Sequence, residues 1–413
     1  MQLNHIDGGT GCFGEPKRKF GFPNNYGTLK AYRLPVAIMR TWRRQHLKPM
    51  ASCMFVALRD LRRSWRRFAL VGLVVALIAL LTTLVTALAN GLVNQGISGL
   101  RALPLDHLVF QPNSDATFSR STLTPAQLQV WRRHDRDASP LGMSFVNASA
   151  SGRTISMALF GLPADSFLVT RRDARAALAG PPGLVLSGLF RSQGVRIGQR
   201  YQIAGTQITL PVLGFTYAGS YGHVQIAFTS LASWQRIAYG GDAEGRFSAI
   251  ALRTSPSLSL NSIDHAAGTT TLTKTASYAG SPGYTGETAT MLMIRVFLII
   301  ISALMVGAFF TVLTLQRTRQ IGVMKALGAS NRYVIGDGLA QIGMVVVLAT
   351  TAGTLLGAGL TVVLKGGTVP LLLTPGSELR AAGILIAAGV IGGGFALRQV
   401  SSVEPAIALG VEV

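Results

Sequence analysis

The sequence carries little charge for its length, and most of that charge is of one sign. Only 13% of its 413 residues are charged and 49% are hydrophobic, whereas soluble domains carry about 25% charged residues. The apolar residues are concentrated in a few long runs, which indicates an integral membrane protein. The net charge is +21, but much of this excess lies beside the apolar runs, where Lys and Arg set orientation. No basic motif with interleaved aromatic residues is present, so nucleic acid is not a predicted partner.

The sequence also has few of the residues that build metal sites, disulfide frameworks or nucleotide sites. Its two cysteines, Cys12 and Cys53, both precede the first apolar run, so the remainder offers neither a disulfide framework nor a CxxC metal pair. The histidines are scattered, without an HExxH spacing. Residues 9–17 superficially resemble a P-loop, but Glu15 stands where a P-loop needs lysine. We therefore expect no catalytic site, no metal site and no cofactor bound by this chain.

Four apolar runs are long enough to cross a bilayer, namely residues 68–90, 290–315, 339–364 and 381–397. About 20 apolar residues in a helix cover the roughly 30 Å hydrocarbon core. The first run lies far from Met1 and is longer than the apolar part of a signal peptide, which favours a retained anchor over a cleaved signal. The predicted fold class is an α-helical integral membrane protein, with one helix, an inserted domain and then three helices.

Basic residues gather at alternate ends of these runs. Five arginines precede the first run, and Arg398 begins the tail 398–413 after the fourth. The loop 316–338 carries four more basic residues, namely Arg317, Arg319, Lys325 and Arg332. The positive-inside rule then places both termini and this loop in the cytoplasm. Residues 91–289 and the outer loop 365–380 face outward, and all four spans fit this alternation.

The part before the first run divides into a tail and a short amphipathic segment. Residues 1–53 are basic and aperiodic, so we expect a disordered tail; a polybasic lipid-binding tail is the alternative, and Met50 or Met54 is a possible translation start. In residues 54–67, apolar side chains recur at helical spacing opposite the arginines, which predicts an elbow helix in the membrane interface. A plain charged stop is the alternative. The apolar face of the elbow helix includes Leu58, Leu61 and Trp65.

Residues 91–289 have a mixed α/β pattern. Strands are predicted over residues 108–111, 154–160, 224–228 and 248–252, and a β-hairpin over residues 198–215. Helices are predicted over residues 183–191, around residues 230–237, and over residues 124–134, where Thr124 is an N-cap and Pro125 the first helical residue.

No catalytic set emerges in this outer domain. Asp135 and Asp137 form a carboxylate pair, but three arginines surround them. A solvated helix end therefore explains this pair better than an acid/base site. His223, beside Tyr221, is interpreted as a residue at a strand edge rather than a ligand.

Residues 316–336 read QRTRQIGVMKALGASNRYVIG and lie between two apolar runs. A cluster of charges comes first, followed by Ile-Gly and then by Lys-Ala-Leu-Gly-Ala. This order resembles the cytoplasmic loop of FtsX-like and MacB-like ABC transporter permeases. Residues 183–215 resemble part of the MacB-type outer domain, with Gln199 where that family often has Asp. The tail from Arg398 through Pro405 to Leu409 also resembles the end of these permeases. The resemblance therefore extends from Met54 to the C-terminus.

Several features of this loop suit contact with a partner protein. We expect a helix over residues 320–329 that ends at Gly328, with Ile321, Met324 and Leu327 as a ridge and Gly322 leaving room for close approach. Arg317, Arg319 and Lys325 would meet acidic protein surface or lipid headgroups. A plain helix-connecting loop is the alternative. The predicted ATPase-coupling residues are Arg317, Arg319, Ile321, Gly322, Met324, Lys325, Leu327 and Gly328.

Small residues recur in the third and fourth runs. Gly353 and Gly357, and likewise Gly389 and Gly393, are four residues apart, and this spacing lets helices pack closely. Packing within one subunit and packing in a dimer interface remain equal alternatives. Arg295, near the start of the second run, is expected to reach toward the outer boundary and Glu287.

The family resemblance implies a function. The chain is expected to be the permease subunit of an ABC transporter in the bacterial cell (inner) membrane, with ATP and magnesium bound by a partner ATPase. A permease homodimer and a possible periplasmic adaptor are further implied partners. The expected activity is export or extraction of an amphiphile, peptide, lipid or lipoprotein, driven by movement of the outer domain. The alternative is an FtsX-like regulator of a cell-wall hydrolase; a membrane-bound enzyme or sensor is disfavoured because no catalytic set is present.

Overall fold

The structure, a computed structural model, describes residues 65–253, 259–326, 328–364 and 369–401. The chain separates into two units, Met1–Ser52 and Cys53–Val413, and every described residue belongs to the second. The predictions for the tail 1–53, for Leu58 and Leu61 of the elbow, for Leu327 and for residues 402–413 lie outside the described residues.

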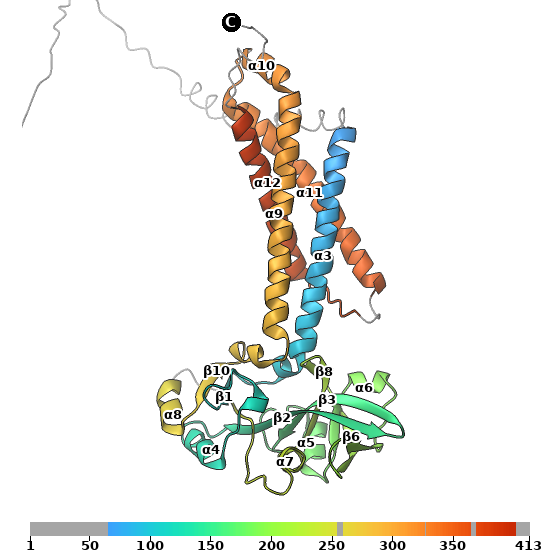
Figure 1. The fold of residues 1–413 in the computed structure, drawn as a ribbon, viewed down its shortest axis with the longest axis vertical. Coiled ribbons are helices and arrows are strands. Elements are labelled where there is room, and N and C mark those ends of the chain that lie inside the picture. Colours follow the sequence, from blue (N-terminus) through green and yellow to red (C-terminus); the bar gives the residue numbers. More distant parts are fainter. Residues whose placement is uncertain (1–64, 254–258, 327, 365–368, 402–413) are drawn as a thin grey trace, which may run out of the picture. The chain divides into compact units, whose positions relative to one another are not determined.

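Four long helices form a bundle (Figure 1), and all four are long and apolar enough to cross a membrane. They are α3 (Trp65–Ala102), α9 (Tyr284–Gln316), α11 (Asn331–Leu364) and α12 (Pro375–Ser401). Each contains one of the four predicted runs and extends beyond it, so that α3 continues well past residue 90. The predicted fold class, one helix and then three with an inserted α/β domain, is confirmed.

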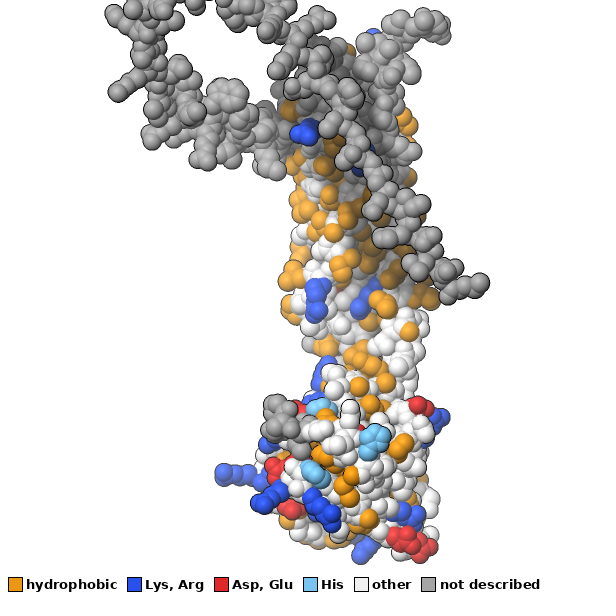
Figure 2. Space-filling view, turned by 90° about the vertical axis from the view of Figure 1, so that its left-hand side faces the viewer, with side chains coloured by type: hydrophobic (Ala, Val, Ile, Leu, Met, Phe, Trp, Pro, Cys, Tyr) orange, Lys and Arg blue, Asp and Glu red, His pale blue; other side chains and the backbone are white. Residues whose placement is uncertain are grey.

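The surface of the bundle differs from that of the sheet domain. Figure 2 shows hydrophobic side chains along the helices, whereas most charged side chains in this view lie on the sheet domain. Leucines along the outer face of a helix are exposed, among them Leu70, Leu73, Leu77 and Leu81 of α3. A helix that is apolar on its outer faces belongs in lipid. The chain is therefore a multi-pass membrane protein with four candidate spans.

The inserted domain is built on a ten-stranded sheet with the strand order β10-β1-β9-β2-β3-β8-β4-β6-β5, while β7 pairs with β8. A further pairing of β5 with β2 closes six of these strands into a ring. The strands are β1 (His107–Phe110), β2 (Ser139–Ala150), β3 (Arg153–Leu162), β4 (Leu184–Ser187), β5 (Arg200–Ile203), β6 (Thr209–Thr216), β7 (Ser220–Tyr221), β8 (Val224–Ser230), β9 (Ala249–Leu252) and β10 (Thr270–Thr273).

Short helices cover this sheet and join it to the bundle. Trp131 of α4 and Trp234 of α7 are buried in one hydrophobic cluster with side chains of the closed ring. The helices are α4 (Pro125–Arg132), α5 (Arg172–Ala179), α6 (Leu189–Ser192), α7 (Leu231–Tyr239) and α8 (Leu260–Ala267), with 3-10 turns at Phe118–Arg120 and Ala276–Gly280.

The predicted start of α4 is confirmed, because Thr124 forms a capping box with Gln127 and Pro125 follows it. The predicted helix over residues 183–191 is wrong in its first half. Residues 184–187 form strand β4, which is buried between β8 and β6, and only α6 follows as helix. A short apolar run does not separate a buried strand from a buried helix, since both faces are apolar in either case.

His223 is not at a strand edge, as the sequence suggested, but in the two-residue turn between β7 and β8. Gly222 and His223 both have positive φ, 56° and 65°. Two-residue hairpin turns of type I′ require this conformation at both central residues. The turn directs His223 away from the sheet and toward the start of α9, where it meets Glu287.

The last turns of α3 are fixed to the sheet domain by close contacts. The Tyr217 hydroxyl donates to the carbonyl oxygen of Gly99 at 2.8 Å, and the Ser281 hydroxyl donates to that of Gly96 at 2.7 Å. A Cβ added at Gly99 would overlap Ile226 of β8. The end of α3 is therefore part of the core of the sheet domain rather than a free linker.

Candidate functional site at the coupling helix

The predicted loop helix is present as α10 (Thr318–Ala326), which begins two residues earlier than expected and ends before Gly328. Arg317 is the C-cap of α9, so only this residue separates α9 from α10. Gly328 has φ +95°, a conformation that L-residues rarely adopt. It allows the chain to turn from α10 into α11.

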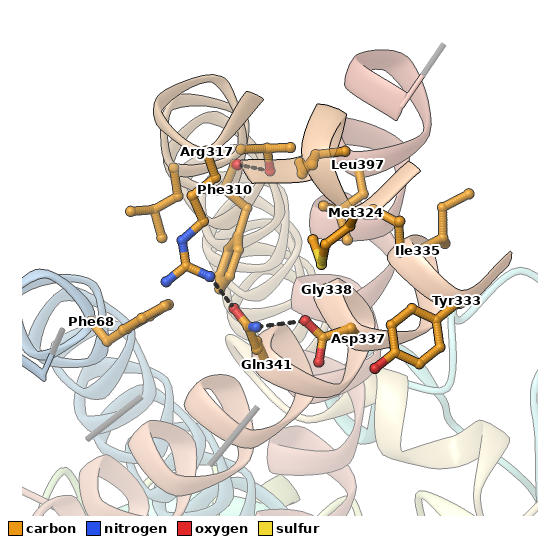
Figure 3. Close-up of a pocket in the computed structure, with 14 residues that line it drawn as sticks. Phe68, Phe310, Arg317, Met324, Tyr333, Ile335, Asp337, Gly338, Gln341 and Leu397 are labelled. Atoms are coloured by element: carbon orange, nitrogen blue, oxygen red, sulfur yellow. Dashed lines mark hydrogen bonds between the residues drawn. The ribbon is translucent and has the colours of Figure 1, made fainter. Parts of the chain in front are cut away.

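A cavity of about 170 Å³ lies between α10 and the bundle. Figure 3 shows residues from all four long helices and α10 around it. Its walls are mostly apolar, with Phe68 of α3, Phe310 of α9 and Leu397 of α12 on three sides. The cavity leaves α10 without a dense core beneath it. Movement of α10 toward the bundle would therefore not require compression of packed side chains.

A chain of polar contacts crosses this cavity (Figure 3). The Arg317 guanidinium donates to Gln341 Oε1 at 3.2 Å, and Gln341 Nε2 donates to Asp337 Oδ2 at 2.9 Å. The guanidinium also lies 5.7 Å from the centre of the Phe68 ring. Gln341 is only 5% exposed, and hydrogen bonds of a buried amide to charged groups contribute about 1.5–3 kcal/mol each. These contacts tie the end of α9 to both α11 and α3.

The predicted coupling residues thus divide into inner and outer sets. Arg317, Ile321 and Met324 line the cavity, so their described contacts lie within this chain. Arg319 is exposed and Gly322 is buried, while the side chains of Lys325 and Leu327 lie outside the described part of the molecule. Val323, which sequence reasoning missed, is 47% exposed beside Arg319.

Gln341 and Asp337 were also missed, although the sequence carried a signal for them. Gln341 is a polar residue inside an apolar run, and such residues are costly unless they face the bundle interior and find a partner. Trp65, predicted for the elbow, is the first residue of α3, but its side chain is not described.

The glycines of the third helix pack against the first helix of the same chain. A Cβ at Gly353 would overlap the carbonyl oxygen of Ala76, and one at Gly357 would lie 2.9 Å from the Cβ of Thr83. These positions let α3 and α11 approach at backbone distance. At Gly359, by contrast, an added Cβ has no described atom within 4 Å.

The glycines of the fourth helix pack against the third. A Cβ at Gly389 would lie 3.0 Å from Val346, and one at Gly393 would lie 2.8 Å from Ile342. Of the two alternatives drawn from the sequence, packing within one subunit is therefore what these described contacts provide for both glycine pairs.

Arg295 does not reach Glu287, which instead lies 3.0 Å from His223. Arg295 instead interacts electrostatically with the carboxylate of Glu378 in α12. Glu378 is 8% exposed. Both carboxylate oxygens of Glu378 and the Nε of Arg295 are buried, with no hydrogen-bond partner among the described residues. The expected contact was wrong, because Glu287 is held by His223 of the sheet domain while α12 supplies the carboxylate near Arg295.

Comparisons with known proteins agree with this architecture. Residues 292–405, which include most of α9 and all of α10, α11 and the described α12, match FtsX-like permease C-terminal. The putative hemin transport system permease protein HrtB of Staphylococcus haemolyticus is 20% identical over 354 residues, covering 83% of this chain and 95% of that protein. Its counterpart in Staphylococcus epidermidis is 24% identical over 162 residues, covering 39% of this chain and 45% of that protein.

Among solved structures, the extracellular domain of the noncanonic ABC-type transporter YknZ from Gram-positive bacteria covers 41% of this chain and 98% of its own, at 12% identity and a TM-score of 0.30. The family match covers most of α9 and all of α10, α11 and the described α12, which line the cavity together with α3. A permease subunit lacks ATPase activity and works with an ATPase partner. From the match of residues 292–405 to the FtsX-like permease model and the similarity to the HrtB proteins, the chain is a permease of an ABC transporter.

Proposed function

We propose that this permease couples ATP hydrolysis in its partner subunit to movement of its sheet domain, and thereby exports or extracts an amphiphile. One observation carries the proposal. The single helix α9, 33 residues long, has Glu287 bonded to the sheet domain at one end and Arg317 at the coupling helix at the other. At 1.5 Å per residue, such a helix spans about 50 Å. A displacement at α10 would therefore reach the sheet domain through one continuous element.

Helix α3 offers a second connection between α10 and the sheet domain. The end of α3 packs into the sheet domain through Gly96 and Gly99, and its start contributes Phe68 to the cavity under α10. Two rigid helices attached to one domain can tilt it, whereas one alone could only shift it. We place both termini and α10 on the cytoplasmic side of a bacterial inner membrane, with the sheet domain outside. The active unit would contain two copies of this chain and two ATPase subunits.

The membrane setting and the names of the relatives support an amphiphilic cargo. The curated relatives are named as putative hemin transport permeases, and hemin combines an apolar ring with carboxylates. Hemin is therefore the first cargo to test, followed by other amphiphiles, peptides, lipids and lipoproteins. A periplasmic adaptor is a further partner to be sought by co-purification.

The test is co-expression with the partner ABC ATPase subunit, followed by co-purification and measurement of cargo export. Arg319→Glu and Val323→Asp change two exposed side chains of α10. Each should reduce ATPase capture by about tenfold, because Arg319→Glu loses a charge-assisted contact and Val323→Asp places a carboxylate in an apolar contact, at a cost of about 1–2 kcal/mol each. Arg172→Glu on the sheet domain serves as the matched control.

Undiminished capture in the α10 variants would overturn the coupling assignment. If capture and ATP hydrolysis are normal but no cargo is exported, and a cell-wall hydrolase loses its activation instead, the regulatory alternative would replace transport.

A further inference from the structure

Two adjoining hollows lie on the sheet domain where β2, β3 and β8 run side by side. One, of about 230 Å³, is lined mainly by polar side chains, with Arg153, Gln193 and Gln225 among them. The other, of about 270 Å³, is lined mainly by apolar side chains, with Phe145 and Met157 among them. The two hollows share Ser156 and Val224 as a common rim, so together they form one surface with a polar half and an apolar half.

The polar half is suited to a negative charge. Arg153 is exposed, and among the described residues neither hollow is lined by Asp or Glu. The Glu287 carboxylate, which lies beside His223, is engaged by that side chain. Gln193 is exposed at the rim of this hollow, where its amide N–H groups can donate to a bound anion. A guanidinium with neighbouring amides is the arrangement that proteins use to hold carboxylates and phosphates.

The apolar half presents a fixed aromatic ring. Phe145 is 44% exposed, although a phenylalanine on a sheet surface is usually covered. Its ring stacks on Tyr221, with 6.1 Å between the ring centres and 15° between the planes. Tyr221 is buried in the domain core. The exposed face of Phe145 is therefore held in one orientation, ready to cover an apolar group without a large loss of side-chain entropy.

The surface lies close to the membrane. The turn that borders the polar half is bonded to α3, because Gly222 N donates to the oxygen of Gly96 and His223 N donates to that of Gln95. The apolar run of α3 ends near Asn90, and five helical residues span about 8 Å. The headgroup region extends roughly 5–8 Å beyond the hydrocarbon core. The hollows are therefore within reach of a molecule that leaves the outer leaflet head first.

We propose that the two hollows form one binding site for an amphiphile with an anionic head group drawn from the membrane. The head group binds the Arg153 guanidinium and the amide N–H groups of Gln193, and the apolar part lies on Phe145 and Val224. The inference rests on the proposed function only in that this ligand would be the cargo; binding itself needs neither ATP nor the ATPase.

The test uses the full-length permease in nanodiscs of zwitterionic phosphatidylcholine, without the ATPase. The probe is a photoactivatable fatty acid that carries a diazirine in its chain, and its methyl ester serves as the uncharged comparison. After illumination, mass spectrometry maps the labelled peptides. The free acid should label peptides that contain Phe145 or Val224, and the ester should label them about tenfold less, because one charge-assisted hydrogen bond is lost.

Variants assign this selectivity to the site. Arg153→Ala and Phe145→Ala should each reduce labelling by the acid several-fold to about tenfold, whereas Arg153→Lys should retain part of it. Arg196→Ala, which removes an exposed arginine of the same domain outside the hollows, should leave labelling unchanged. Wild-type thermal unfolding of each variant excludes misfolding as the cause.

Equal labelling by acid and ester, or full labelling of Arg153→Ala, would overturn the site. Stimulation of the ATPase by α10 is measured separately on the same variants. Loss of the site with intact ATPase capture would refute this inference alone, and loss of capture with an intact site would refute only the coupling proposal.

Discussion

His223 Nε2 lies 3.0 Å from Glu287 Oε1, and this contact joins the β7–β8 turn of the sheet domain to the first turn of α9. Both side chains are partly covered, at 30% and 28% exposure. The contact is an ion pair when the imidazole is protonated and a hydrogen bond when it donates as neutral histidine. It lies at the point where movement of a helix in the membrane would become movement of the domain.

Replacing Glu287 with Gln should weaken this link without unfolding the protein. A partly exposed pair of this kind contributes about 1 kcal/mol to stability, so thermal unfolding should change little. Export should nevertheless fall several-fold at an unchanged rate of ATP hydrolysis, because α9 would move without carrying the domain with it. Cargo export per ATP hydrolysed is the measurement, and Glu244→Gln on an exposed loop is the control. Unchanged export per ATP would show that α3 alone carries the movement.

Replacing Gln341 with Leu should break the bridge between Arg317 and Asp337. The substitution removes an amide that bonds to both charged groups, and it should destabilise the bundle by about 1–3 kcal/mol. ATP hydrolysis by the assembled complex should become less dependent on cargo, since α9 is no longer fixed to α11. Thr351→Leu, at an exposed position on the same helix, is the control. Retention of both the melting temperature and cargo stimulation would contradict a role for this bridge.

A larger side chain at Gly353 should disrupt the contact between α3 and α11. A Cβ there would overlap the backbone of α3 at Ala76, whereas Gly359 on the same helix has open space. Gly353→Val should cost about 1–3 kcal/mol or more and lower the amount of folded permease in the membrane. Gly359→Val should behave like the wild type, with similar loss of helix propensity in both variants. Equal yields and melting temperatures for the two variants would contradict this packing.

The carboxyl of Asp135 should oppose folding at neutral pH. Burial, together with the nearby Asp137, raises the pKa of Asp135 above its ordinary value of 3.8, although the backbone hydrogen bond from Asp137 counteracts part of the rise. A raised pKa means that the folded state prefers the protonated form, so the penalty is present above the folded pKa and vanishes below 3.8. Asp135→Asn should therefore stabilise the full-length protein slightly at pH 7.

The same variant should show no advantage at a pH below 3.8, where the wild-type carboxyl is protonated in both states. Thermal unfolding at both pH values provides the comparison. An Asp135→Asn protein that is less stable than the wild type at pH 7 would mean that the charged carboxylate makes a favourable contact. The structure offers no such contact to Oδ2 of Asp135, which is buried without a hydrogen-bond partner in the described part of the chain.

Elements with a local cause could be predicted from the sequence. The four spans follow from uninterrupted apolar runs, α4 follows from Thr124 and Pro125, and α10 follows from its glycine stop. The signal in each case lies within a few residues of the element that it specifies. The hairpin of β5 and β6 was predictable for the same reason, because its turn residues lie between its strands.

Elements whose environment is made by distant parts of the chain could not be predicted. The apolar sequence of β4 is equally compatible with a buried helix, and only its pairing with β6 and β8 makes it a strand. The long strand β2 was missed because Gly142 weakens its strand pattern, although Trp234 of α7 occupies the space above this glycine. The direction of Arg317 was likewise decided by Gln341, 24 residues later. Sequence spacing gives no information on such pairings.

The pairing of β5 with both β6 and β2 has a mechanical consequence for the permease. Six strands closed on themselves have no unpaired edges at which the domain could bend or slide. This closed part of the domain should therefore turn as a single rigid body when α3 and α9 move. Its far loops, including residues 241–246, could then differ in length or sequence between related transporters, and so accept different partners, without changing the stroke delivered from the cytoplasmic side.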